Sequence, residues 1–154
     1  MIEIVPASSK DHLNEAEELF REYADWLDLE MCYRNIDKEI AELPGAYGPP
    51  GGNLLLAYVD GETAGCAGVR KWKGDVCEMK RLYVRPRFRG TGIGRKLAEM
   101  IIEEARRIGY RLMRLDTLPQ MNEAIELYKS LGFKQIEKYR TSPTDDSQYF
   151  ELAL

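Results

Sequence analysis

The segment Leu82–Ala98, LYVRPRFRGTGIGRKLA, constrains this chain more than any other part of the sequence. It has the pattern of a strand end, a basic turn rich in glycine, and the start of an amphipathic helix. Five cationic side chains and no acidic ones fall between Arg85 and Lys96. Main-chain N–H groups at such a helix N-terminus bind anions. The segment therefore predicts a phosphate-binding site, with a solvated basic turn as the alternative.

Apolar periodicity and Gly or Pro punctuation predict the other elements. Strands are expected at Ile2–Val5, Leu54–Val59, Thr63–Trp72, Val76–Val84, Leu112–Thr117, Lys134–Tyr139 and Gln148–Leu154. Helices are expected at Leu13–Leu27, from Asn35 or Asp37 to Leu43, at Ile93–Ile108 and at Ala124–Leu131. The order β-α-α-β-β-β-α-β-α-β-β joins an antiparallel meander to a further strand through a crossover helix. It predicts an α/β (α+β) fold, a mixed sheet with helices on both faces.

Composition narrows the class of protein. A length of 154 residues suits one domain, residues 1–154, and 44% hydrophobic with 31% charged residues indicates a globular chain. A net charge of −4 argues against nucleic acid as a partner. No apolar run is long enough to cross a membrane, and no signal peptide is evident. Cys32, Cys66 and Cys77 lack C-x-x-C spacing, so we expect no disulfide, no metal site and a cytoplasmic setting.

Three phosphate-binding motifs can be compared with the turn. A Walker A loop fails because Gly94 is followed by Arg95-Lys96. A Rossmann fingerprint fails because Arg95 stands where its third glycine should be, and because several strands precede the turn. The third motif, R-x-x-G-x-G, is met by Arg89-Gly90-Thr91-Gly92-Ile93-Gly94. This hexapeptide resembles the acetyl-CoA loop of the GNAT superfamily of N-acetyltransferases.

Two further segments resemble the same superfamily. Glu78–Val84, EMKRLYV, is similar to its central strand, and Asn122–Phe133, NEAIELYKSLGF, to a later helix and strand entry. The three segments occur in the family's order. The resemblance implies one N-acetyltransferase domain around a mostly antiparallel sheet, with acetyl-CoA as cosubstrate and no metal. The first third of the chain resembles the family only in outline.

The resemblance also implies the residues that hold acetyl-CoA. Pantetheine would pair with the central strand, and the diphosphate would lie on the glycine turn. The residues so implied are Leu82, Tyr83, Val84, Arg89, Gly90, Thr91, Gly92, Ile93, Gly94, Arg95, Lys96, Asn122 and Tyr128. Asn122 could equally be the N-cap of its helix.

Two side chains are candidates for catalysis. An ammonium acceptor must lose a proton before it attacks, and Glu78 is the candidate base. Its alternative role is a strand carboxylate paired with Lys80, Arg81 or another cation. Tyr128 matches the family's tyrosine and is the candidate donor to the leaving thiolate, with a packed aromatic as the alternative. The predicted reaction is direct attack, because no cysteine lies at a helix start beside a histidine, and His12 is expected at the surface.

The acceptor is expected to be a small-molecule or peptide amine held by the variable segments Trp26–Arg34, Pro44–Gly52 and Tyr139–Gln148. Tyr33, Tyr47, Trp72 and Tyr139 are candidate lining residues. Asp25, Asp28 and Glu30 favour a cation, whereas Arg34 and Arg140 favour a carboxylate. The other class of function is a non-catalytic acyl-CoA sensor, and a nucleotide binder is a third. A homodimer is a reasonable expectation for a small sheet protein.

Overall fold

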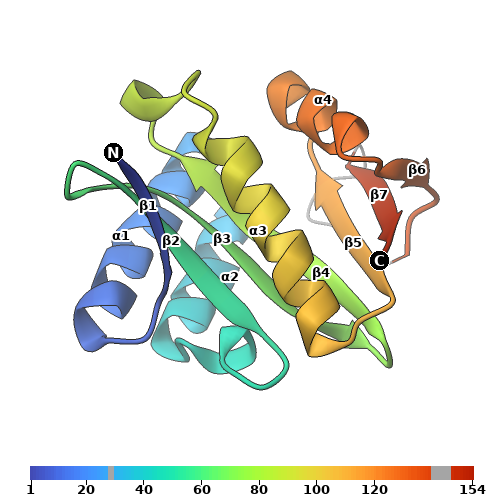
Figure 1. Ribbon diagram of the computed structural model, residues 1–154, viewed down its shortest axis with the longest axis horizontal. Coiled ribbons are helices and arrows are strands. Elements are labelled where there is room, and N and C mark those ends of the chain that lie inside the picture. Colours follow the sequence, from blue (N-terminus) through green and yellow to red (C-terminus); the bar gives the residue numbers. More distant parts are fainter. Residues whose placement is uncertain (28–29, 140–146) are drawn as a thin grey trace.

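The computed structural model describes residues 1–27, 30–139 and 147–154. Figure 1 shows a central sheet with helices against it. The side chains of Asp28, Glu30, Cys32, Tyr33, Arg34 and Arg140, named above as candidates or as cysteines, lie outside the described part.

The elements follow the predicted order. The strands are β1 (Ile2–Pro6), β2 (Asn53–Val59), β3 (Glu62–Lys73), β4 (Val76–Val84), β5 (Leu112–Thr117), β6 (Lys134–Ile136) and β7 (Gln148–Ala153). The helices are α1 (Lys10–Leu27), α2 (Glu30–Ala41), α3 (Ile93–Ile108) and α4 (Asn122–Ser130), with short 3-10 helices η1 (Gly45–Tyr47) and η2 (Pro86–Phe88). The bounds of β4, α3 and β5 are those predicted.

The strands form one sheet in the order β1-β2-β3-β4-β5-β7-β6. Every described pairing is antiparallel except β4 with β5, which is parallel. The α3 helix forms the crossover connection between these two parallel strands. The predicted mixed, mostly antiparallel sheet is confirmed.

Two hydrophobic cores lie on opposite faces of the sheet. On one face, α1 and α2 pack through Leu19, Phe20 and Ile36 against residues of β2 and β3. On the other, Leu97 and Ile101 of α3 and Ile125 of α4 share one cluster with residues of β2, β3, β4, β5 and β7. Because neighbouring strand residues face opposite cores, a polar residue on β4 or β5 is directed to one side or the other by its position alone.

The second helix was predicted too short. It begins at Glu30, not at Asn35 or Asp37, and ends at Ala41 rather than Leu43. Asn35 and Asp37 are residue types that favour N-caps, but here they flank Ile36, which is 1% exposed in the core against α1. Burial of one apolar face outweighed the local capping preference.

One smaller expectation was also wrong. The strand expected at Lys134–Tyr139 ends at Ile136, because only three of its residues pair with β7. The Pro44–Gly52 segment contains the single-turn helix η1, whose Tyr47 is buried.

Among the residues described, none of the helices combines the length and the apolar character that crossing a bilayer requires.

Candidate active site

The strands β4 and β5 separate partway along their length. They pair over only three residues each, Val76–Glu78 with Leu112–Arg114. From there β4 continues to Val84 and β5 to Thr117, and the two strands no longer pair with each other. Figure 1 shows the two strands diverging toward the end of the sheet where the η2 turn and α4 lie. The gap leaves two strand edges whose main-chain groups can bind an extended ligand.

A β-bulge in β4 lies beside this gap. Cys66 pairs with Tyr83 and Gly68 pairs with Lys80, so Arg81 and Leu82 together oppose the single residue Ala67. Arg81 has φ 59°, in the left-handed region that non-glycine residues seldom adopt. The extra residue places both Lys80 and Arg81 along one cavity on the α2 side of the sheet. Bulges commonly redirect side chains in this way beside active sites.

The glycine turn leads from β4 into α3. Gly90 (φ 79°) and Gly92 (φ 87°) are both left-handed, and Gly92 is the N-cap of α3. A Cβ built on either glycine would meet nothing within 4 Å, so the outer side of the turn is open to a ligand. Arg85 fastens the start of the turn to α1 through Glu22, with Nη2 2.6 Å from Oε2. The turn therefore presents main-chain N–H groups on a fixed base.

The arginine of the motif turns back toward its own strand. Arg89 Nε donates to the Val84 carbonyl over 2.8 Å, and its guanidinium lies over the rings of Trp26 (4.7 Å) and Tyr83 (5.7 Å). Arg95 donates to Ser130 Oγ, which ties α3 to α4. Lys96 is exposed in the first turn of α3. In this arrangement Arg89 shapes the turn, while Lys96 remains near the helix N-terminus.

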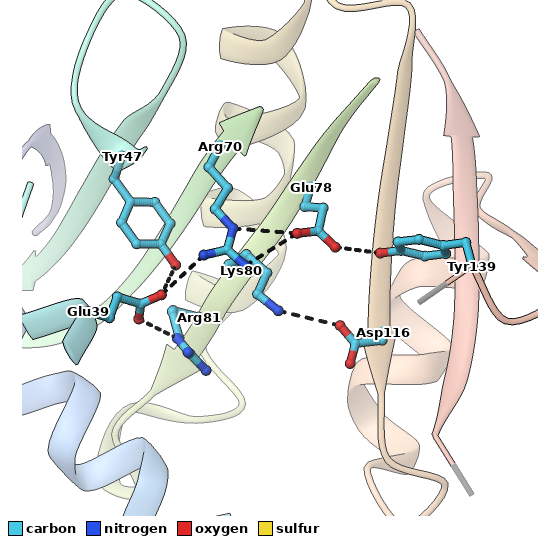
Figure 2. A network of polar contacts seen from close by, with 8 residues as sticks. All are labelled: Glu39, Tyr47, Arg70, Glu78, Lys80, Arg81, Asp116 and Tyr139. Atoms are coloured by element: carbon cyan, nitrogen blue, oxygen red, sulfur yellow. Dashed lines mark hydrogen bonds and ion pairs between the residues drawn. The ribbon is translucent and has the colours of Figure 1, made fainter. Parts of the chain in front are cut away.

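Glu78 is completely buried, at 0% exposure, where β4 and β5 part. Its Oε2 accepts a hydrogen bond from the Tyr139 hydroxyl over 2.6 Å. Its Oε1 lies 3.4 Å from both Nε and Nη2 of Arg70, the residue opposite it in the β3–β4 ladder. Figure 2 shows the carboxylate between these two groups. Among the described residues, Arg70 forms an ion pair with Glu78, while Lys80 lies 3.5 Å from Asp116 on β5.

Tyr128 lies on α4 at the other side of the gap. It is 7% exposed, and its ring contacts Phe133 and Phe150. Burial raises the pKa of Tyr128 above its usual value of 10, and the nearby Tyr23 and Asp116 raise it further. The phenol is thus protonated at neutral pH. Tyr128 is therefore packed like a core aromatic residue, and its protonated hydroxyl can also donate a hydrogen bond.

Asn122 is exposed at the first residue of α4. The N-cap is Met121, and no side-chain capping bond is present. The alternative role of Asn122 as N-cap is therefore wrong. By contrast, Ser9 caps α1 by accepting a hydrogen bond from the His12 N–H, and His12 Nδ1 accepts from the Ser8 N–H.

Cys66 and Cys77 are buried in the strands β3 and β4. Burial raises the pKa of each thiol to about 12. Neither side chain is a thiolate at neutral pH, so neither is suited to nucleophilic attack.

A polar cavity of 380 Å³ lies between α2, η1 and the β3–β4 hairpin. Its lining includes Lys38, Glu39, Glu42, Pro44, Gly45, Ala46, Tyr47, Arg70, Lys80 and Arg81. Glu39 is at the centre of a set of contacts that we call the Glu39 cluster: Glu39, Tyr47, Arg70 and Arg81 (Figure 2). Glu39 Oε1 accepts from the Tyr47 hydroxyl (2.9 Å) and Arg70 Nη1 (3.4 Å), and Oε2 accepts from Arg81 Nε (2.8 Å).

Two of the residues expected to line the acceptor site, Tyr47 and Tyr139, lie in or next to the Glu39 cluster. Tyr47 belongs to it, and its pKa is raised by burial. Tyr139 reaches the same network through Glu78 and packs edge-on against Trp72 at 5.3 Å. Burial by itself lowers the pKa of Arg81, but the adjacent Glu39 carboxylate reverses the shift and keeps the guanidinium charged.

Sequence reasoning missed Glu39 and Arg70 and named Arg81 only as a possible partner of Glu78, whereas Arg81 pairs with Glu39. For Arg70 a signal existed, because the predicted turn at Lys73–Asp75 implies a register with Arg70 close to Glu78. For Glu39 there was none, since its partners lie 8, 31 and 42 residues away on three other elements.

The fold and the split sheet define an acyltransferase architecture, and comparisons with known proteins agree. The profile of the Acetyltransferase (GNAT) family matches residues 13–133. An uncharacterized N-acetyltransferase of Schizosaccharomyces pombe is 40% identical over 144 residues, which is 92% of this chain and 88% of that protein.

Solved structures share the whole fold. An acetyltransferase from Streptococcus agalactiae superposes with a TM-score of 0.83 at 22% identity, covering 99% of this chain and 98% of the other. The PaiA N-acetyltransferase from Thermoplasma acidophilum, in complex with coenzyme A, gives 0.79 at 20% identity, covering 100% and 99%. The chain belongs to the GNAT family and is an acyltransferase.

Proposed function

We propose that this chain transfers an acetyl group from acetyl-CoA to a primary amine, by direct attack of the amine on the thioester. The observation that supports the proposal most strongly is the split between β4 and β5, with an open glycine turn at its end. A free strand edge can pair with the amides of a ligand, and the helix N-terminus that follows it can bind phosphate groups. Together they suit a ligand with amides at one end and phosphates at the other.

In this proposal the donor is held mainly by main-chain groups. Leu82, Tyr83 and Val84 offer a strand edge to the pantetheine amides. The Val84 carbonyl already accepts from Arg89, which leaves it one lone pair for such a bond. The N–H groups from Gly90 to Gly94 and the dipole of α3 stabilise the diphosphate, and the cationic Arg95 and Lys96 add charge. Asn122 faces solvent near the same end of the sheet and is a candidate pantetheine contact.

The proposed chemistry needs a group that accepts the amine proton. Glu78 is the proposed base. Because it is buried and accepts from Tyr139, the amine proton would reach it through the Tyr139 hydroxyl, which passes its own proton on to the carboxylate. The Arg70 guanidinium lies 3.4 Å from the Glu78 carboxylate and pairs with it.

Two further groups act on the thioester. A main-chain N–H near Leu82, at the bulge, is proposed to stabilise the oxyanion that forms on the carbonyl. The Tyr128 phenol donates to the sulfur as the C–S bond breaks. Since burial raises its pKa above 10, it is suited to donate a hydrogen bond rather than to release its proton fully. The thiolate then takes up a proton from solvent at neutral pH.

Calorimetric titration with acetyl-CoA, CoA and ATP, followed by thiol release with a panel of amines, tests the proposal. We expect acetyl-CoA and CoA to bind, ATP to bind far more weakly, and thiol release to depend on the amine. Binding of acetyl-CoA without release for any amine would favour the non-catalytic sensor. Tight ATP binding without CoA binding would overturn the assignment.

A further inference from the structure

In the Glu39 cluster, the oxygens of Glu39 accept several hydrogen bonds, whereas part of the Arg81 guanidinium donates none to the described residues. Both oxygens of Glu39 accept hydrogen bonds, from Tyr47, Arg70 and Arg81. Arg81 contributes only Nε to that arrangement. Its terminal Nη1 and Nη2 groups donate no hydrogen bond to any residue of the described ranges. The cluster thus uses three of about four lone-pair positions of Glu39 and leaves a double donor on Arg81 unused by the described part of the chain.

The spare donor is largely buried. The Arg81 side chain is 14% exposed, and its guanidinium lies 6.0 Å from the ring centres of Phe20 and Tyr23. Its left-handed backbone at the bulge places it along the cavity. Buried N–H donors that lack an acceptor are costly, so the two Nη groups of Arg81 are suited to a ligand that supplies one.

Charge around the cavity favours an anion. Its lining carries the cations Lys38, Arg70, Lys80 and Arg81, against the carboxylates of Glu39 and Glu42. Arg70 and Lys80 also pair with Glu78 and Asp116, which leaves the charge for a ligand mainly to Lys38 and Arg81. Glu42 is exposed at the rim, and both oxygens of Glu39 already accept hydrogen bonds from residues of the cluster.

We propose that Arg81 binds a carboxylate of the acceptor, so that the amine substrate is an amino acid or a similarly small amino-carboxylate. The inference rests on the proposed function. The planar edge of two N–H groups matches the two oxygens of a carboxylate, a pairing that lysine cannot reproduce.

The geometry suits a short molecule. Arg81 and Glu78 are three residues apart on β4 and face the same side of the sheet, with the Arg70 guanidinium between Glu39 and Glu78 (Figure 2). A carboxylate on Arg81 would leave the amine of the same molecule near the gap between β4 and β5, where the thioester is expected. A 380 Å³ cavity accommodates an amino acid but not a folded peptide segment.

The first test compares matched acceptors. Each amino acid is assayed beside its own carboxamide, which has the same side chain, no negative charge and a more readily deprotonated amine. We expect kcat/KM to be about 10- to 100-fold higher for the acids. Equal values, or a preference for carboxamides or diamines, would overturn the inference.

The second test removes the paired N–H groups of the Arg81 guanidinium. Arg81→Lys keeps a cation beside Glu39 but loses the paired N–H edge. We expect it to raise KM for the preferred amino acid about 10- to 100-fold, to leave KM for the carboxamide within about 3-fold, and to leave acetyl-CoA affinity unchanged. Arg106→Lys, on the exposed face of α3, is the matched control and should change none of these values. Thermal unfolding of each variant checks that it is folded, and an equal loss for acid and carboxamide would count against the assignment.

A third measurement separates this inference from the proposed function. If no amine releases thiol, the proposed transfer fails. Calorimetric binding of the same acids and carboxamides, to wild type and to Arg81→Lys, then decides the role of Arg81 without turnover. Binding of acids that the variant loses supports it, and no difference between the two proteins contradicts it.

Discussion

The two halves of the candidate site are built from different parts of the chain. The proposed donor side, from Leu82 to Lys96, is one contiguous segment whose useful groups are mostly main-chain N–H and C=O. The proposed acceptor side, the Glu39 cluster with its cavity, consists of side chains from α2, η1, β3 and β4. A site of main-chain groups depends on backbone conformation and tolerates changes of side chain. A site of paired side chains depends on single atoms.

The largest effect is expected where the two halves meet, at Glu78. Glu78→Gln keeps the size of the side chain and an acceptor for Tyr139, but removes the base. We expect kcat/KM for the amine to fall about 100- to 1000-fold near neutral pH, and the loss to shrink as pH rises, because more of the amine is already deprotonated. A pH profile of kcat/KM measures this.

A drop of equal size at every pH would assign Glu78 a structural role instead. Glu151→Gln on β7, where the carboxylate pairs with Arg114 at 2.8 Å, is the control for loss of a sheet carboxylate. It should change kcat/KM much less.

The next largest effect is expected at Tyr128, a side chain on the proposed donor side. Tyr128→Phe retains the ring packing against Phe133 and Phe150, and should leave acetyl-CoA affinity unchanged while lowering kcat about 10- to 100-fold. Burial raises the pKa of Tyr128 above 10, so the phenol is protonated from about pH 6 to 9 and the ratio of wild-type to variant kcat should be constant there. An unchanged kcat, or a ratio that varies across this range, would contradict its role as donor.

A backbone change tests the main-chain character of the donor side. Gly92→Ala adds one methyl group to open space but forces alanine to φ 87° at the start of α3. At about 1–2 kcal/mol for a left-handed residue, acetyl-CoA affinity should fall about 5- to 30-fold with amine KM unaltered. Gly74→Ala has similar strain (φ 58°) in the β3–β4 turn, and should lower the free energy of unfolding without a change in affinity. Equal affinities for the two variants would show that the turn does not hold the donor.

The smallest effect is expected from charge alone. Lys96 is exposed in the first turn of α3, where a cation near the diphosphate contributes about 0.3–1 kcal/mol. Lys96→Gln should therefore weaken acetyl-CoA binding about 2- to 5-fold at low salt, and less at high salt. A loss that salt does not reduce would indicate a direct structural contact.

The same contrast explains what the sequence could predict. The bounds of β4, α3 and β5 follow from strong apolar periods ended by Pro86, Gly92 and Gly109. The glycine turn could be located because all of its groups lie side by side in the chain. The register that brings Arg70 beside Glu78 was within reach of the hairpin argument, although only the structure shows it.

The acceptor side could not be predicted in this way. Glu39 and Arg81 lie 42 residues apart, and they meet only because α2 packs across the sheet. The bulge at Arg81 has no local signature, since neither glycine nor asparagine occupies the left-handed position. Tertiary packing determines both features, so they become visible only when the elements are assembled.

The most direct test of the account is thiol release from acetyl-CoA by the wild-type protein, measured with and without small amines. The account predicts amine-dependent release with an acetylated amine as the second product, and saturation by acetyl-CoA. Two results would contradict the claim that acetyl-CoA binds in the split between β4 and β5 and gives its acetyl group to an amine there. They are thiol release that is independent of amine, and binding of acetyl-CoA with no release for any amine.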